Sequence, residues 1–532
     1  MSVSVAVLWL GAAGPLSAAA PTVIASCPAT ISSPGYYATE SELSATGDCI
    51  TIKASNVTLA LYETIDGDSS GKGTGITIAK GATGVVIRGH GSVVRYFQNG
   101  IVDQGGGASI GGLSLENNTT GLLLAGASSN PTLVDNVESS SNGIGVHVTS
   151  AAGIRINGLQ MYYNTDHGLW LDKSSQNSVT IGFTAYQNAM QVEIDSSGNT
   201  VGTCELDYGQ YGIVIKKGAG NNLVADCGYD TGADAAVSDA LDHNKACGSN
   251  FWIANSFSTG SPKCVLKTYP HGMTVLTACQ SIDASGFYFV KGNLKASGDC
   301  FVVDAPNVML FSKFHTVTGA GAGTGLHVMP NATGFRSGGL AFKKFATGME
   351  IDADGALVEG NDANKNRDTG IFVNGANGVT VGENDTDGNR RFGYHLLNAS
   401  GTMIHNYGAF SNGIYGVFIE NSNGNLFDQF NAGDNGANGI AGVYIGCSTK
   451  GPTGGCESES SLRNVVTSGS AYNNTKYGFV IDGHSDQNVM ATLYAGGNGI
   501  DDVYDANRNC AGNVWWLDTF NTSNDAACMN QQ

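Results

Sequence analysis

The sequence is poor in charge, and in basic charge above all. Only 13% of its 532 residues are charged, with 26 Lys and Arg against 45 Asp and Glu, so the net charge is -19. This balance excludes nucleic acid as a partner, because the phosphate backbone is bound by clustered Lys and Arg. It also argues against purely electrostatic attachment to an anionic membrane. An acidic polysaccharide would be repelled too, unless a cation or a local basic patch intervenes.

Long apolar runs are missing as well. After the first 20 residues, no stretch approaches the roughly 18 consecutive apolar residues of a membrane-spanning helix, so no transmembrane anchor is predicted. Residues 1–20 contain an apolar stretch that ends in Ala18-Ala-Ala before Pro21. This pattern is typical of a secretory signal peptide, although the usual basic residues before it are absent. We therefore expect a secreted protein, either extracellular or periplasmic.

Motifs that would name a reaction are also lacking. The sequence contains no H-E-x-x-H zinc motif and no phosphate-binding loop. Motifs therefore leave open whether the protein is an enzyme. Candidate site residues have to be sought among side chains that the fold stacks together.

Glycine, in contrast, is abundant, with 76 residues against only 10 Pro. A glycine followed by alternating apolar residues recurs every 21 to 26 residues, first as Gly121-Leu-Leu-Leu, Gly145-Val-His-Val and Gly168-Leu-Trp-Leu, and again between residues 348 and 445. A fixed period of this length marks a solenoid. Short strands with no helical pattern between them predict an all-β fold, the parallel β-helix.

The 12 cysteines fall into spaced pairs rather than metal-type clusters. We interpret all of them as disulfides formed in an oxidising compartment. The predicted pairs are Cys27–Cys49, Cys204–Cys227, Cys247–Cys264, Cys279–Cys300, Cys447–Cys456 and Cys510–Cys528.

The chain also looks internally duplicated at an offset of about 250 residues. Gly47-Asp48-Cys49 corresponds to Gly298-Asp299-Cys300, and Cys247-Gly-Ser-Asn-Phe-Trp corresponds to Cys510-Ala-Gly-Asn-Val-Trp. Because the open ends of a β-helix expose unpaired strands, we interpret the disulfide-closed segments as caps. We predict two tandem copies, at residues 27–264 and 279–528, joined by a linker at 265–278. One continuous stack is the alternative.

The repeats resemble those of the pectin-lyase-like superfamily. The opening Pro34-Gly-Tyr, Gly47-Asp-Cys-Ile and Ala54-Ser-Asn-Val-Thr-Leu are similar to secreted NosD-like proteins. The resemblance covers nearly the whole chain after residue 26 and implies a right-handed β-helix. That superfamily includes polysaccharide lyases, glycoside hydrolases, epimerases and adhesins, so the resemblance leaves the activity open.

Aligning the repeats on their glycines stacks the outward-facing residues of successive coils. Neighbouring strands lie about 4.8 Å apart, so one patch is predicted to contain His147, Trp170, Asp172, Glu193, Asp195 and Lys216. Three stacked carboxylates repel unless they are solvated, protonated or bridged. Asp172, Glu193 and Asp195 are therefore a candidate Ca²⁺ site. A cation bound there would neutralise a uronate carboxylate, and Lys216 or His147 would act as the acid or base. A merely solvated face and simple carbohydrate binding are the alternatives.

Two further features stand out in the outward positions. Asp166-His167, just before a repeated glycine, is either a polar turn or an acid–base pair. In the second copy, a column that begins with His327 and Glu350 continues through Phe372, His395, Phe418 and Tyr444, and Asp352 opens the neighbouring column. The aromatic part is a candidate platform for sugar rings, or a surface covered by a loop or a second copy.

Taken together, these patterns predict an exported, carbohydrate-directed β-helix protein. It would either process a polysaccharide, as a lyase or epimerase does, or bind one, and calcium is the only cofactor considered. The alternative is a structural or adhesive surface protein without catalysis, for which self-association is expected.

Overall fold

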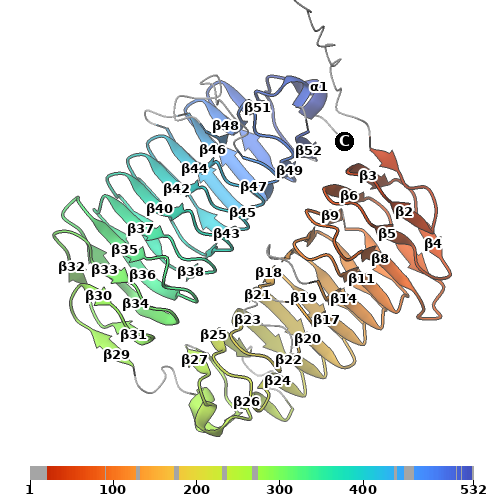
Figure 1. The fold of residues 1–532 in the computed structure, drawn as a ribbon, viewed down its shortest axis with the longest axis horizontal. Helices are drawn as coiled ribbons and strands as arrows, with labels where there is room; N and C mark the ends of the chain where they lie inside the picture. Colours follow the sequence, from red (N-terminus) through yellow and green to blue (C-terminus); the bar gives the residue numbers. More distant parts are fainter. Residues whose placement is uncertain are drawn as a thin grey trace, which may run out of the picture.

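The computed structural model describes residues 21–529, except 90, 127–131, 152, 173–178, 230–235, 254, 267–272, 437–439, 448–460, 511 and 517. The predicted signal segment, residues 1–20, lies outside this part of the chain. Within it the chain forms a parallel β-solenoid (Figure 1), in which each strand pairs in parallel with strands of the preceding and following coils. The predicted parallel β-helix is confirmed.

Two sets of coils are present, and each contributes an outer and an inner sheet. The outer sheet of the first set has 11 strands: β2 (Ala29–Ile31), β5 (Ile50–Ile52), β8 (Thr74–Ile78), β11 (Asn99–Asp103), β14 (Thr120–Leu124), β17 (Ile144–Val148), β20 (His167–Leu171), β22 (Met190–Ile194), β24 (Tyr211–Ile215), β26 (Ser238–Asp242) and β28 (Gly260–Ser261). That of the second set has 10: β30 (Gln280–Ile282), β33 (Phe301–Val303), β35 (Thr324–Val328), β37 (Thr347–Ile351), β40 (Thr369–Asn374), β42 (Phe392–Leu397), β44 (Tyr415–Glu420), β46 (Ala441–Gly446), β48 (Tyr477–Ile481) and β51 (Asp501–Asp505).

The inner sheets are larger. The first has 17 strands: β1 (Thr22–Val23), β3 (Gly35–Thr39), β4 (Leu43–Ala45), β6 (Val57–Leu61), β7 (Ile65–Gly67), β9 (Val86–Gly89), β10 (Val93–Arg95), β12 (Ser109–Gly111), β13 (Ser114–Glu116), β15 (Leu133–Asp135), β16 (Glu138–Ser140), β18 (Arg155–Asn157), β19 (Gln160–Tyr162), β21 (Val179–Tyr186), β23 (Thr200–Asp207), β25 (Leu223–Tyr229) and β27 (Phe251–Ile253). The second has 14: β29 (Thr274–Leu276), β31 (Gly286–Val290), β32 (Leu294–Lys295), β34 (Val308–Thr318), β36 (Arg336–Lys343), β38 (Leu357–Glu359), β39 (Asp362–Asn364), β41 (Thr380–Gly382), β43 (Met403–Gly408), β45 (Leu426–Gly433), β47 (Val465–Tyr472), β49 (Val489–Ala491), β50 (Tyr494–Gly496) and β52 (Val514–Trp516).

Helical structure is minor and lies near the ends of the two sets. The described residues contain three short 3₁₀ segments and one α-helix: Lys245–Cys247, Lys263–Leu266, Arg508–Cys510 and α1 (Ala526–Met529). None of the described helices is long and apolar enough to cross a membrane.

The repeated glycine has a packing cause. A Cβ atom on Gly145 would lie 2.6 Å from the carbonyl oxygen of Gly168, and one on Gly370 would lie 2.7 Å from that of Gly393. Side chains at these positions would collide with the backbone of the next coil. The spacing of the repeated glycines in the sequence therefore equals the length of one coil, because each glycine lies where its coil contacts the next.

Inward side chains and buried amides hold the coils together. Leu169 and Leu171 are fully buried, as their alternation with Trp170 predicts. Beside this core, asparagines form ladders along the axis: the Asn142 amide donates to Asn164 Oδ1 at 3.0 Å, and the Asn164 amide donates to Asn188 Oδ1 at 3.0 Å. Each ladder residue satisfies a turn that would otherwise bury an unpaired donor.

The two sets of coils lie side by side and run in opposite directions (Figure 1). Tyr62 near the start of the chain meets Trp516 near its end, with ring centroids 5.5 Å apart, and Phe251 stacks against Phe287 at 6.4 Å. Among the described strands, no sheet continues from the first set into the second. Each set has its own hydrophobic core, and two smaller clusters join them along a seam between the inner sheets.

The seam also contains charged groups that burial has removed from water. Arg155 donates to the carbonyl oxygen of Gly378 at 3.1 Å, and Arg336 donates to that of Gly198 at 3.1 Å. Burial lowers the pKa of both guanidinium groups to about 10. These cross-connections fix the alignment of the two sets of coils.

Both sets close in the same way. Asp242 Oδ2 accepts hydrogen bonds from Asn250 and from the Trp252 indole at 3.0 and 3.2 Å. Asp505 Oδ2 accepts the equivalent bonds from Asn513 and Trp515 at 3.0 and 3.1 Å. Five of the six predicted disulfides are present: Cys27–Cys49, Cys204–Cys227, Cys247–Cys264, Cys279–Cys300 and Cys510–Cys528.

The Cys447–Cys456 disulfide and the boundaries of the two copies stay predictions. Cys456, the predicted partner of Cys447, lies outside the described residues. Within the predicted linker 265–278, β29 pairs with β31 and so belongs to the second set of coils.

Candidate functional site

The outer sheet of the first set brings the predicted outward residues onto neighbouring strands. Trp170 on β20 lies opposite His147 on β17, and Glu193 on β22 lies opposite Trp170. Asp172, Asp195 and Lys216 follow β20, β22 and β24, and their amides donate to the preceding coil at 3.1, 2.8 and 2.9 Å. The predicted columns therefore exist.

The break in the repeat at Gln191 leaves this register intact. Val192 and Ile194 are fully buried in the core, so Glu193 between them belongs to the outward column. Gln191 itself is buried; its side chain accepts from Asn188 at 2.6 Å and donates to the carbonyl oxygen of Asp207 at 2.6 Å. The Gln191 side chain, which stands where other coils have glycine, is thus accommodated by a hydrogen bond to the next coil.

Two imidazoles stack on the ring of Trp170. The ring of His147 lies 4.4 Å from that of Trp170 and that of His167 lies 5.2 Å away, both nearly parallel to it. His147 Nε2 also lies 3.4 Å from Asp172 Oδ2. Burial lowers the pKa of His147, and the Asp172 carboxylate offsets only part of this effect. His147 is therefore neutral at neutral pH and can accept a proton.

Glu193 is the most enclosed acid of this patch, with only 7% of the residue exposed. One carboxylate oxygen lies 2.9 Å from Lys216 Nζ and 3.5 Å from His167 Nε2. Burial raises the pKa of Glu193, but hydrogen bonds from His167 and Lys216 outweigh it and bring the net pKa below the ordinary value. Glu193 is thus ionised and forms an ion pair with Lys216.

His167 is the residue whose place in the site the sequence prediction missed. Its Nδ1 lies 3.2 Å from Asp166 Oδ1, as the predicted pair requires, but its other nitrogen faces Glu193 on the next strand. It starts β20 rather than lying in a turn. Residues directly before the repeated glycine form a third outward column, and stacking that column would have found it.

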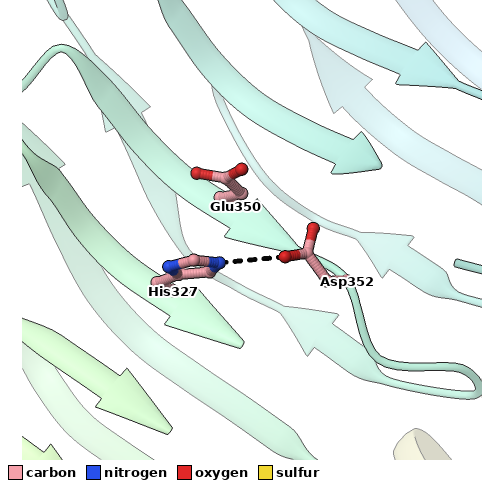
Figure 2. Close-up of side chains that lie close together, drawn as sticks. All are labelled: His327, Glu350 and Asp352. Carbon is pink, nitrogen blue, oxygen red and sulfur yellow. Dashed lines mark hydrogen bonds and ion pairs between the residues drawn. The ribbon is translucent and has the colours of Figure 1, made fainter. Parts of the chain in front are cut away.

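The structure offers a different metal-binding group from the predicted one. Among the described residues, one set of three can place ligand atoms within 4.8 Å of one another: His327, Glu350 and Asp352 (Figure 2). His327 Nε2 lies 2.9 Å from Asp352 Oδ2. Asp172, Glu193 and Asp195 form no such set in the described chain, and calcium at those residues stays a prediction.

The aromatic column of the second set is partly covered. Phe372 and Phe418 stack on either side of His395, with centroids 4.9 and 5.0 Å away. However, Phe418 and Tyr444 are fully buried, so of the two predicted alternatives the covered surface applies to these residues. Aromatic residues at the start of neighbouring strands pack over them, together with Ile440. Phe372 and His395 remain partly exposed.

A cavity of about 760 Å³ opens at the seam between the inner sheets. Its walls include Arg88, Asp135 and Trp516, and Arg88 donates to Asp135 at 2.6 Å. Asp428, fully buried beside this pair, has its pKa raised to about 8 by burial and by Asp135, which Arg88 opposes. No sequence pattern pointed to this cavity, because it exists only where the two sets of coils meet.

Comparison with known proteins places the chain by family. The sequence profile described as "Right handed beta helix region" matches residues 64–246 and 340–492, more than half of the chain. This confirms the predicted right-handed β-helix. No curated protein sequence matches the chain.

Several solved structures are similar at low identity. The A-module of the mannuronan C-5 epimerase AlgE6 from Azotobacter vinelandii is 13% identical, with 93% of this chain and 90% of that chain covered and a TM-score of 0.21. The periplasmic alginate epimerase AlgG is 10% identical, with coverage of 86% and 77% and a TM-score of 0.25. The PL6 family alginate lyase AlyGC is 9% identical, with coverage of 92% and 93% and a TM-score of 0.21.

Proposed function

The chain belongs to the family of right-handed β-helix proteins, and we propose that within it this protein is exported and acts on a polysaccharide. The observation that carries the proposal is the outer face of β17, β20, β22 and β24. There the neutral imidazole of His147 and the indole of Trp170 lie on adjacent strands, and the partly exposed Lys216 follows β24 two strands further on. The disulfides support export, because such bonds persist in oxidising compartments.

Each group on this face has a role toward a sugar chain. From β17 to β24 the strands span about 14 Å, at about 4.8 Å per strand, so several sugar units fit across them. Trp170 supplies the exposed part of its indole for apolar contact with a sugar, and Lys216, which is partly exposed beside Glu193, supplies a cation for a uronate carboxylate. Glu193 and His167 fix Lys216 and Trp170 in position.

The chemistry that suits these groups is proton abstraction next to the uronate carboxylate. When Lys216 neutralises the uronate carboxylate of the substrate, the C–H bond next to that carboxylate becomes more acidic. The neutral His147 then accepts this proton, and Asp172 orients the His147 ring. Loss of the leaving group then gives a lyase, and return of a proton on the other face gives an epimerase. If neither follows, the face binds polysaccharide without reaction.

The test is activity and binding on polyuronate oligosaccharides. Unsaturated product would be followed by ultraviolet absorbance, inversion by nuclear magnetic resonance, and retention by pull-down. We expect His147→Ala to lower turnover by about 100-fold or more, the usual contribution of a positioned base, and Lys216→Ala to raise KM. His395→Ala, in a similar His–carboxylate pair on the other set of coils, is the matched control. If the wild type neither binds nor converts any oligosaccharide, the structural or adhesive alternative replaces the proposal.

A further inference from the structure

One arrangement of side chains occurs three times among the described residues of the outer sheets. A histidine at an outward position places its Nε2 near a carboxylate 25 residues later in the sequence. The three pairs and their distances are His147–Asp172 at 3.4 Å, His327–Asp352 at 2.9 Å and His395–Glu420 at 2.8 Å. We refer to them as the His–acid pairs.

The residue opposite the histidine on the next strand differs between them. It is Trp170 in the first pair, Glu350 in the second and Phe418 in the third. The two aromatic rings stack on their histidines at 4.4 and 5.0 Å and so cover one face of the imidazole. Glu350 instead brings a second carboxylate to the same place, beside the pair formed by His327 and Asp352 (Figure 2).

The carboxylates at the second pair lack the cation that the first patch possesses. Glu193 is held by Lys216 at 2.9 Å, whereas among the described residues no Lys or Arg forms an ion pair with Glu350 or Asp352. Asp352 Oδ1 is buried and has no hydrogen-bond partner in the described chain. Glu350 receives only a long bond from the Thr324 hydroxyl, at 3.5 Å. Two carboxylates and an imidazole thus converge without a Lys or Arg paired to them in the described chain.

The backbone fixes this convergence. β35 and β37 pair in parallel with His327 opposite Glu350, and the Asp352 amide donates to the carbonyl oxygen of Val328 at 2.8 Å. The three side chains therefore come from two adjacent rungs of a rigid ladder rather than from mobile loops. Sites built on strands hold their ligands more precisely than sites on loops.

We propose that His327, Glu350 and Asp352 bind a divalent first-row transition-metal ion such as Zn²⁺. One imidazole nitrogen and two carboxylate oxygens form a mixed donor set that suits this class of ion, whereas Ca²⁺ and Mg²⁺ prefer oxygen ligands alone. Three protein ligands leave at least one coordination position open. His327 and Asp352 retain partial exposure, with 24% and 16% of their side chains accessible, so that position faces solvent and can take water or an anionic ligand.

Metal binding by the untagged, full-length protein tests the proposal. After treatment with a chelator, the protein would be dialysed against Zn²⁺ at about pH 7, and bound metal would be measured by elemental analysis and calorimetry. No described cysteine is free, so thiols of that part of the chain do not compete for the ion. We expect one equivalent of Zn²⁺ on the wild type, and Co²⁺ in its place to give a visible absorption band.

Variants of the three residues and one matched pair decide the assignment. His327→Ala and Glu350→Gln should weaken Zn²⁺ binding by more than about 100-fold, since even outer-shell partners contribute 10–100-fold. Glu350→Phe, which copies the arrangement around His395, should abolish binding while circular dichroism shows the fold unchanged. His395→Ala should bind Zn²⁺ like the wild type.

Three results would overturn the assignment. The first is a wild type that binds no Zn²⁺, and the second is equal loss of binding in His395→Ala and His327→Ala. The third is tighter binding of Ca²⁺ that His327→Ala leaves unchanged. None of these results bears on His147 and Lys216, so failure here is distinguishable from failure of the polysaccharide proposal.

Discussion

Replacing Asp428 with Asn should make the protein more stable at high pH. Asp428 lies fully buried at the seam, where its Oδ2 accepts from Asn136 at 3.4 Å and its Oδ1 has no partner among the described residues. Burial and the neighbouring Asp135 raise its pKa from 3.8 to about 8. Asn keeps the shape and the acceptor of the side chain but cannot become charged.

The size of the effect follows from the pKa difference. Because the folded protein holds this proton more tightly than the unfolded chain does, its stability falls as the pH rises from about 4 to about 8. Each unit of pKa difference corresponds to about 1.4 kcal/mol, which sets an upper limit of roughly 6 kcal/mol. We expect Asp428→Asn to exceed the wild type by about 1 to 2 kcal/mol near pH 5 and by several kcal/mol more near pH 9.

Thermal unfolding at the two pH values measures this. For a unit of about 250 residues, 1 kcal/mol shifts Tm by roughly 2 °C, so the difference in Tm between Asp428→Asn and the wild type should be several degrees larger at pH 9 than at pH 5. Asp135→Asn is the opposite control at pH 5, where it removes the ion partner of buried Arg88 and should destabilise by about 3 kcal/mol. An equal difference between Asp428→Asn and the wild type at pH 5 and pH 9 would refute the reasoning, because Asp428 would then hold the same charge at both.

Further predictions concern the coils and the proposed site. Gly145→Ala should lower Tm by several degrees, because its Cβ would lie 2.6 Å from a carbonyl oxygen, whereas Gly483→Ala, with open space around it, should leave Tm within about 1 °C. Asn164→Ala should cost about 3 kcal/mol in denaturant unfolding, because it removes three buried hydrogen bonds from the ladder, and an unchanged midpoint would contradict the role of the ladder. If His147 is a base, kcat/KM should rise with pH and level off below pH 6.5, because burial lowers the pKa of His147; a limb that continues to rise above pH 7 would point to a different base.

The columns of the outer sheets were predictable because they depend on local pattern. The glycine period sets which residues stack, and alternation sets which face outward, so His147, Trp170 and Glu193 were placed correctly from the sequence. His167 was missed because a residue directly before the repeated glycine was interpreted as part of a turn, although it begins β20.

Burial and partnership were not predictable in this way. Phe418 and Tyr444 face outward in the register, yet Tyr415 and Ile440 pack over them, and no repeat pattern encodes that cover. The contacts across the seam were even less predictable. Asn136 and Asp428 are 292 residues apart in sequence, and their contact depends on how the two sets of coils pack against each other. Likewise, His327, Glu350 and Asp352 were each placed outward, but their convergence depends on side-chain conformations.

The seam has a consequence for how such a chain can change in length. A lone solenoid grows or shrinks by one coil at little cost, since each repeat contacts only its neighbours. Here the first coils of one set rest against the last coils of the other, through pairs such as Tyr62 with Trp516 and Phe251 with Phe287. Inserting a coil into one set alone would shift every contact beyond it by one rung, so insertions and deletions should be accepted during evolution only in matched pairs.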